Sequence, residues 1–230
     1  PVIVDDTADI AKAAKDIIDG CTFDNNLPCI AEKEVFVFNN VADELISGMK
    51  KAGSYQINKA QADELAKSVL VTKTGKDGNV SKSVNRDCVG RDAKVLLERI
   101  GVHVGDDIRC IIAEVPFEHD FVQEELMMPI LGIVRVRNID EAIDLACKAE
   151  AGRRHSAHMH SKNIDNLSRF ARAIETTIFV KNAPSYAGIG YHAEGHTTFT
   201  LAGPTGEGIT SARSFTRQRR CVMADSFRII

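Results

Sequence analysis

The sequence predicts an α/β fold in which a mostly parallel sheet is flanked by helices. Short runs of apolar, largely β-branched or aromatic residues alternate with longer segments whose apolar residues recur at helical spacing. Strands separated by helices imply parallel pairing, because parallel strands need crossover connections. The 230 residues, 44% of them hydrophobic and 27% charged, have ordinary globular composition and suffice for one sizeable domain.

The individual elements follow from this pattern. A strand-like run opens the chain, and strand character returns at residues 219–230. The other strands are expected at residues 34–38, 108–112, 131–136, 156–160 and 177–180. Helices are expected at residues 7–18, 41–51, 58–70, 92–100, 139–149 and 164–174, the first capped by Thr7 and others by Asn58 and Asn138.

Three polar segments interrupt the regular pattern. Residues 21–31 form a loop between a helix and a buried strand, and residues 72–86, polar and glycine-containing, are expected to form an exposed loop. Residues 182–216 are rich in Gly, Pro, Ser and Thr. A long irregular stretch in a compact protein is usually functional.

Composition and charge argue against several classes of protein. The net charge of -3 gives no basic field for nucleic acid, and no apolar run approaches the length of a membrane span. The six cysteines form no C-x2-C pair, which leaves a zinc knuckle or thioredoxin motif unsupported. Free thiols of this kind indicate a reducing, cytosolic compartment.

Cys29 is the residue best placed for covalent chemistry. It follows Pro28 in a loop before a buried strand, so its backbone is restrained. From spacing alone a packed, inert cysteine is the commoner interpretation, since no local rule for cysteine nucleophiles transfers between families.

Residues 23–34, FDNNLPCIAEKE, resemble the catalytic-cysteine segment of the aldehyde dehydrogenase superfamily. They are most similar to the CoA-acylating propionaldehyde and acetaldehyde dehydrogenases of propanediol and ethanolamine utilisation. Residues 123–129, QEELMMP, resemble the superfamily's cofactor-contacting segment. Residues 179–188, FVKNAPSYAG, and 203–208, GPTGEG, resemble late loops of the acylating group, and the likeness runs from about Pro1 to Cys221.

The resemblance implies an oxidoreductase that converts a short-chain aldehyde, CoA and NAD+ into acyl-CoA and NADH. Cys29 would form a thiohemiacetal and then an acyl thioester, which CoA would attack. The family has a Rossmann cofactor domain, a catalytic domain and an oligomerisation ribbon. No G-x-G-x-x-G sequence occurs here, so we expect the Rossmann domain to precede Pro1 and this chain alone to lack full activity.

The resemblance also implies roles for particular residues. Glu125 matches the position that binds the nicotinamide ribose, and Met127 would flank the nicotinamide; without the resemblance they would be a solvated acid and a core side chain. His155 would assist proton movement at the thioester step, although a surface histidine is equally consistent with the residues. Asn26, Ile189 and Thr198 are expected to line the substrate channel. Tyr191, His192 and His196 depart from the family's pattern.

The histidines of residues 155–160 do not predict a metal site. Alternation along a strand puts His158 and His160 on one face and His155 on the other, whereas zinc needs three or four convergent ligands. We therefore expect no metal.

The predicted organisation is a catalytic domain at residues 1–216 and an oligomerisation tail at residues 217–230, with a homo-oligomer as the assembly. The resemblance places the protein in the cytoplasm, in the lumen of a bacterial microcompartment, and gives it no nucleic acid or membrane partner. Two other functions stay open: a cysteine-dependent acyltransferase or thioesterase, and a non-catalytic assembly module.

Overall fold

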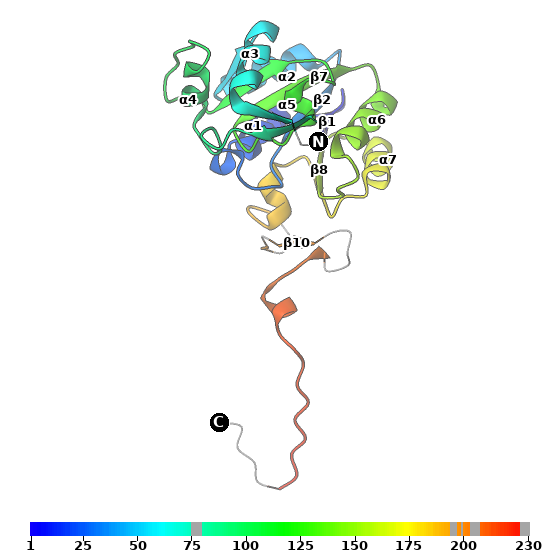
Figure 1. The fold of residues 1–230 in the computed structure, drawn as a ribbon. Coiled ribbons are helices and arrows are strands. Elements are labelled where there is room, and N and C mark those ends of the chain that lie inside the picture. The colour runs from blue at the N-terminus through cyan, green and yellow to red at the C-terminus, as the bar shows by residue number, and fades with distance from the viewer. Residues whose placement is uncertain (75–79, 194–196, 199, 203–207, 226–230) are drawn as a thin grey trace.

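The computed structural model describes residues 1–74, 80–193, 197–198, 200–202 and 208–225. A seven-stranded sheet has the order β3-β6-β7-β2-β1-β8-β9, and every neighbouring pair in it is parallel (Figure 1). Its strands are β1 (Val2–Val4), β2 (Glu34–Phe38), β3 (Ser54–Ile57), β6 (Cys110–Glu114), β7 (Ile130–Val136), β8 (Ser156–His160) and β9 (Ile178–Lys181). The predicted α/β class with a parallel sheet is confirmed.

Helices connect the strands of this sheet. They are α1 (Ile10–Cys21), α2 (Ala42–Lys51), α3 (Lys59–Val69), α4 (Ala93–Glu98), α5 (Asp120–Gln123), α6 (Ile139–Glu150) and α7 (Ile164–Ile174). Short 3-10 turns lie at η1 (Phe23–Asn26), η2 (Ser185–Ile189) and η3 (Ala212–Phe215). In the described part of the chain, none of the helices has the length and apolar character needed to cross a membrane.

The sheet separates two apolar layers. Val35 and Val37 of β2 point to one face, where they pack with α1 and α2. Phe36 and Phe38 point to the other face, where α3 to α7 supply the apolar side chains. Because both faces of β2 are covered, all five of its residues are buried, as is usual for a central parallel strand.

The structure corrects one predicted helix cap and adds one strand that was not predicted. Asp9, and not Thr7, caps α1, because its carboxylate accepts the N–H of Lys12, while the Thr7 hydroxyl donates to Asp5 Oδ1 at 2.6 Å. The capping predictions for Asn58 and Asn138 are confirmed. Strand β3 was not predicted, because a run of four residues carries too little alternation to stand out.

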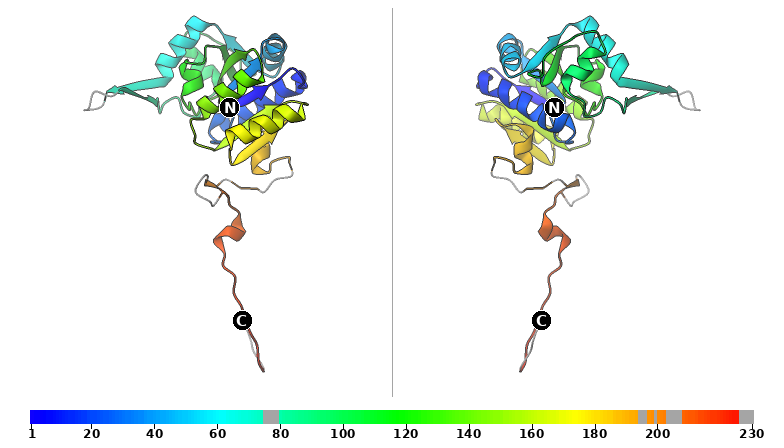
Figure 2. Two further views of the ribbon diagram at one scale, coloured as in Figure 1. Left: turned by 90° about the vertical axis from the view of Figure 1, so that its right-hand side faces the viewer. Right: turned by 90° about the vertical axis from the view of Figure 1, so that its left-hand side faces the viewer.

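The segment predicted as an exposed loop at residues 72–86 is largely a hairpin. Strands β4 (Leu70–Thr74) and β5 (Val80–Val84) pair antiparallel and project from the body of the molecule (Figure 2). The loop prediction was wrong because the polar side chains of this ribbon are solvated on both faces. The many polar residues indicated a loop, although Val, which favours strands, occurs in both segments and Thr, which also favours strands, recurs in β4.

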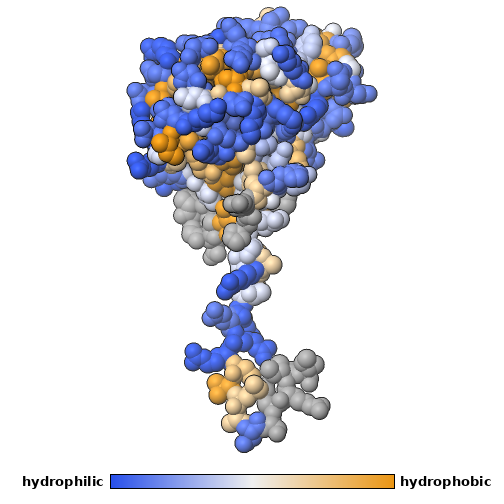
Figure 3. Space-filling view, turned by 180° about the vertical axis from the view of Figure 1, so that it is seen from behind, coloured by the Kyte–Doolittle hydropathy of each residue, from blue (hydrophilic) through white to orange (hydrophobic). Residues whose placement is uncertain are grey.

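The C-terminal residues leave the body as an extended segment after β10 (Leu201–Ala202) and β11 (Gly208–Ile209). Residues 219–225 form no strand, and residues 226–230 lie outside the described part of the chain. Within this single chain no strand pairs with residues 219–225, so the predicted oligomerisation strand stays a prediction. Phe215, Val222 and Met223 are exposed on this stretch, which is otherwise largely hydrophilic (Figure 3).

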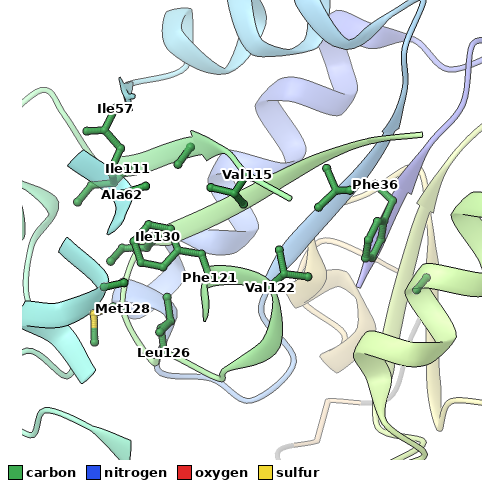
Figure 4. Close-up of a cluster of buried hydrophobic side chains, with 14 of the residues drawn as sticks. Phe36, Ile57, Ala62, Ile111, Val115, Phe121, Val122, Leu126, Met128 and Ile130 are labelled. Atoms are coloured by element: carbon green, nitrogen blue, oxygen red, sulfur yellow. The ribbon is translucent and has the colours of Figure 1, made fainter. Parts of the chain in front are cut away.

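Replacing Phe121 with alanine should lower the free energy of unfolding by about 3–5 kcal/mol. Phe121 of α5 is fully buried in the apolar cluster that also contains residues of α3 and β7 (Figure 4). Its truncation therefore leaves a cavity. Urea denaturation of the chain measures the loss. Phe215→Ala is the matched control, because Phe215 is 76% exposed and its loss should change stability by less than about 0.5 kcal/mol. Equal effects of the two substitutions would contradict the placement of Phe121.

Candidate active site

The segments singled out by sequence meet at the amino edge of the parallel sheet. Cys29 precedes β2, Glu125 precedes β7, and His155 directly precedes β8. Strands β7, β2, β1 and β8 are consecutive neighbours in the sheet. The loops that enter these strands therefore lie side by side, although up to 126 positions separate them in the sequence.

A cavity of about 300 Å³ opens among these loops. Cys29, Asn26, Glu125 and His155 all line it. The structure thus brings together four of the seven residues expected to act on substrate or cofactor. Sequence reasoning missed three charged lining residues, Lys33, Glu150 and Arg153, each of which lies within five positions of Cys29 or His155.

The loop that carries Cys29 begins with an unusual backbone turn. Asp24, Asn25 and Asn26 have φ angles of 48°, 50° and 64°, all in the left-handed region. A left-handed conformation costs an ordinary residue roughly 1–2 kcal/mol, although Asn and Asp tolerate it best. Part of that cost is offset by the Asn25 amide, which donates to Gly90 O at 3.1 Å and to Asp92 Oδ1 at 2.8 Å.

The Cys29 thiol is accessible but not fully solvated. Burial raises its pKa above the ordinary value, a hydrogen bond with its own backbone N–H lowers it, and the negative charge of Glu125 raises it again. Of the six cysteines, Cys29 and Cys221 are exposed, Cys147 is half-buried, and Cys21, Cys88 and Cys110 are buried. An accessible thiol in a lined cavity fits the nucleophile better than the packed, inert alternative.

His155 lies in the same cavity as a half-buried imidazole. Burial lowers its pKa, while the charges of Glu125 and Glu150 raise it. Its backbone N–H donates to Glu150 Oε1 at 3.0 Å, and Nδ1 lies 3.3 Å from the Ser156 hydroxyl. A histidine whose pKa is lowered is neutral at pH 7 and can accept a proton.

The Glu125 segment is held on β7 by close backbone packing. A side chain added at Gly132 would put its Cβ 3.1 Å from the carbonyl oxygen of Phe121, so α5 lies directly on the strand. Met127 has a φ of 56°, and its carbonyl accepts the N–H of Gly90 at 2.9 Å. Glu125 is exposed at the cavity, whereas Met127 is partly buried and does not line it.

The remaining predicted residues lie elsewhere. Ile189 is buried in a small cluster with Ile30, Ile178, Val180 and Ala187, and Thr198 is buried with its hydroxyl accepting the N–H of Thr200 at 3.2 Å. Neither lines the cavity. His196 and most of residues 203–208 lie outside the described residues.

The histidines of β8 are buried in the sheet. His158 and His160 are 1% and 2% exposed, and burial lowers both pKa values, that of His160 to about 4. Among the residues that the structure describes, no three His, Cys, Asp or Glu side chains are grouped so that they could hold a metal ion.

Replacing Glu125 with glutamine should lower the pKa of Cys29, because removal of a negative charge favours the thiolate. The thiolate is the reactive form, so the iodoacetamide rate constant at pH 7.5 should rise roughly twofold, the size expected for a partly solvated charge pair. Measuring the rate constant of Cys29 alkylation from pH 6 to pH 10 gives a curve whose inflection reports the pKa of Cys29. Glu124→Gln is the control, since Glu124 does not line the cavity. An inflection that moves to higher pH in the Glu125 variant would contradict this arrangement.

The geometry defines a class: a parallel α/β domain with an accessible thiol at the amino edge of its sheet. The family model described as "Aldehyde dehydrogenase family" matches residues 1–196. The chain therefore belongs to the aldehyde dehydrogenase family.

Individual relatives narrow the comparison. The chain is 48% identical over 232 residues to the acetaldehyde dehydrogenase (acetylating) EutE of Salmonella typhimurium. That match covers 100% of this chain and 49% of the Salmonella protein. Propionaldehyde dehydrogenase of Rhodopseudomonas palustris, solved with bound CoA and an acylated cysteine, is 54% identical with a TM-score of 0.88. That match covers 97% of this chain and 49% of the solved one.

A third comparison is with the propionaldehyde dehydrogenase of the Clostridium phytofermentans fucose utilisation bacterial microcompartment. The identity is 56% and the TM-score 0.86, over 100% of this chain and 51% of that one. The chain spans about half the length of the relatives it matches.

Proposed function

We propose that this chain is the thiol-bearing part of a CoA-acylating aldehyde dehydrogenase, with Cys29 as the nucleophile. The observation that carries the proposal is the cavity in which Cys29, Glu125 and His155 meet. Its supports are the family match and the acylated cysteine of the similar propionaldehyde dehydrogenase. The substrates are a short-chain aldehyde and CoA.

The chain's own residues account for the covalent steps. The Cys29 thiolate adds to the aldehyde carbonyl and forms a thiohemiacetal, whose oxyanion accepts the backbone N–H of Cys29. NAD+, when bound, supplies the oxidation by accepting hydride. The product is a thioester on Cys29, and the sulfur of CoA displaces Cys29 from the acyl group. His155, neutral at pH 7, takes the proton of the CoA thiol in that exchange.

The residues present fit part of a nicotinamide cofactor. The exposed carboxylate of Glu125 at the cavity can accept a hydrogen bond from a ribose hydroxyl. Met127, whose carbonyl accepts the N–H of Gly90, does not line the cavity; it would give an apolar contact to a nicotinamide ring that lies beside the Glu125 segment. Ile189 and Thr198 would shape the outer channel. Adenine and pyrophosphate recognition belong to residues outside this chain.

The assembly and location are part of the same proposal. The exposed apolar side chains of the extended segment would be covered in a homo-oligomer, with residues 217–230 as the oligomerisation tail. The similar enzyme from a fucose utilisation microcompartment supports a microcompartment lumen as the site of action.

Mass spectrometry of the acylated enzyme tests the function. The intact enzyme, incubated with propionyl-CoA, should carry a propionyl group on the peptide that contains Cys29. With propanal and NAD+ it should form NADH through many turnovers only when CoA is added. Continued turnover without CoA would instead indicate hydrolysis, and acylation without any NAD+-dependent oxidation would favour the acyltransferase alternative.

A further inference from the structure

The side-chain amide of Asn26 closes the loop that carries Cys29. Its Nδ2 donates to the carbonyl of Glu32 at 2.9 Å and to the carbonyl of Cys21 at 3.1 Å, and it lies 3.2 Å from the Cys21 sulfur. Cys21 is the last residue of α1, and Glu32 lies two residues before the start of β2. A single amide therefore fixes both ends of the loop to each other.

The residues that accept from this amide are fully buried. Cys21 and Glu32 are both 0% exposed, and the Glu32 carboxylate accepts the backbone N–H of Ser185 at 2.9 Å. Burial raises the pKa of Glu32 to about 8, so the carboxyl is mostly protonated at pH 7 and brings little charge beneath the site. The Asn26 amide is thus anchored on packed structure, while Cys29 stands on the exposed part of the loop.

The left-handed backbone at position 26 does not by itself explain an asparagine. Glycine would adopt a φ of 64° with less strain. What asparagine adds is the pair of hydrogen bonds across the loop. These bonds use both N–H groups of the amide, so Asn26 borders the cavity without a free donor for substrate.

We infer that Asn26 is a positioning residue, whose amide holds the Cys29 sulfur and backbone N–H in the geometry needed to attack an aldehyde. This inference rests on the proposed function and adds a residue to it. The sulfur must approach the carbonyl carbon while the N–H of the same residue meets the oxyanion. Both atoms belong to the loop, and small displacements of reacting groups cost large factors in rate.

Two substitutions in the intact enzyme separate the amide from the backbone. Asn26→Gly keeps the left-handed turn and removes the amide, and Asn26→Asp keeps the turn and the size but removes the donors. Either should lower kcat/KM for aldehyde about tenfold or more. In Asn26→Gly, which adds no charge to the cavity, the loss should be the same at every pH and the pH inflection should be unchanged. KM for CoA should stay within about twofold, because the loop and not the CoA site is changed.

The matched control is Asn25→Gly in the same turn. Asn25 has a φ of 50°, but its amide points outward to Gly90 and Asp92. It should lower kcat/KM by less than about threefold, since the tie across the loop remains.

Alkylation of the same proteins reports their folding. In an intact variant, iodoacetamide labels Cys29 and Cys221 while the buried Cys21, Cys88 and Cys110 stay protected. A kcat/KM within about threefold of the unmodified enzyme in Asn26→Gly, with those cysteines protected, overturns the inference. Labelling of the buried cysteines in both Asn26 variants also overturns it, because the amide would then be needed for the stability of the fold and not for positioning Cys29. Failure of the proposed function has a different signature, namely activity that survives loss of Cys29.

Discussion

Replacing Cys29 with alanine is expected to abolish acyl-CoA formation, with a loss of about a thousandfold or more in kcat. Alanine keeps the small apolar volume but has no sulfur, so neither the thiohemiacetal nor the thioester can form. The loop should be retained, because the bonds of Asn25 and Asn26 do not involve the thiol of Cys29. NADH formation from aldehyde, NAD+ and CoA in the intact enzyme measures the effect.

The other accessible thiol provides the control. Cys221 is exposed like Cys29 but lies on the extended C-terminal segment, and Cys221→Ala should keep full activity. Circular dichroism of both variants would show that the fold is unchanged. A Cys29→Ala enzyme that keeps more than a few per cent of the activity would end the proposal that this residue is the nucleophile.

Local pattern was sufficient to predict most of the sheet. Helix α7 matches its predicted limits because Asn163 caps its start and its apolar residues recur at helical spacing. Strand β8 matches because polar and apolar residues alternate along it. The hairpin at residues 70–84 was missed because its strands face water, so the sequence shows no apolar face. The strand expected in the extended C-terminal segment stays a prediction, because a strand needs a partner, which the described residues of this single chain do not supply.

The site was predicted in its parts but not in its geometry. Motif resemblance located Cys29, Glu125 and His155 on separate loops. Their meeting depends on the order of strands β7, β2, β1 and β8, which is a property of the folded sheet. The raised pKa of Cys29 depends on burial and on Glu125, nearly a hundred residues away, and could not be read from the loop alone.

Isothermal titration of the 230-residue chain with NAD+ should show a dissociation constant in the millimolar range or weaker. Glu125 offers one charge-assisted hydrogen bond, worth roughly 1.5–3 kcal/mol. Micromolar binding needs about 8 kcal/mol, and no glycine-rich dinucleotide motif of the G-x-G-x-x-G type is present in the sequence to supply the rest. Hydride transfer from aldehyde by this chain should therefore be too slow to measure.

Acyl exchange should survive in the same chain, because transfer of an acyl group between CoA and Cys29 needs no nicotinamide. Incubation with propionyl-CoA and detection of a propionylated Cys29 peptide tests this half-reaction, with Cys29→Ala as the control. The contrast between acylation and NAD+ binding assigns the two activities to different residues. Micromolar NAD+ binding by the chain would show that the cofactor contacts extend well beyond Glu125 and Met127, and that the amino edge of this sheet holds more of the nicotinamide site than one carboxylate.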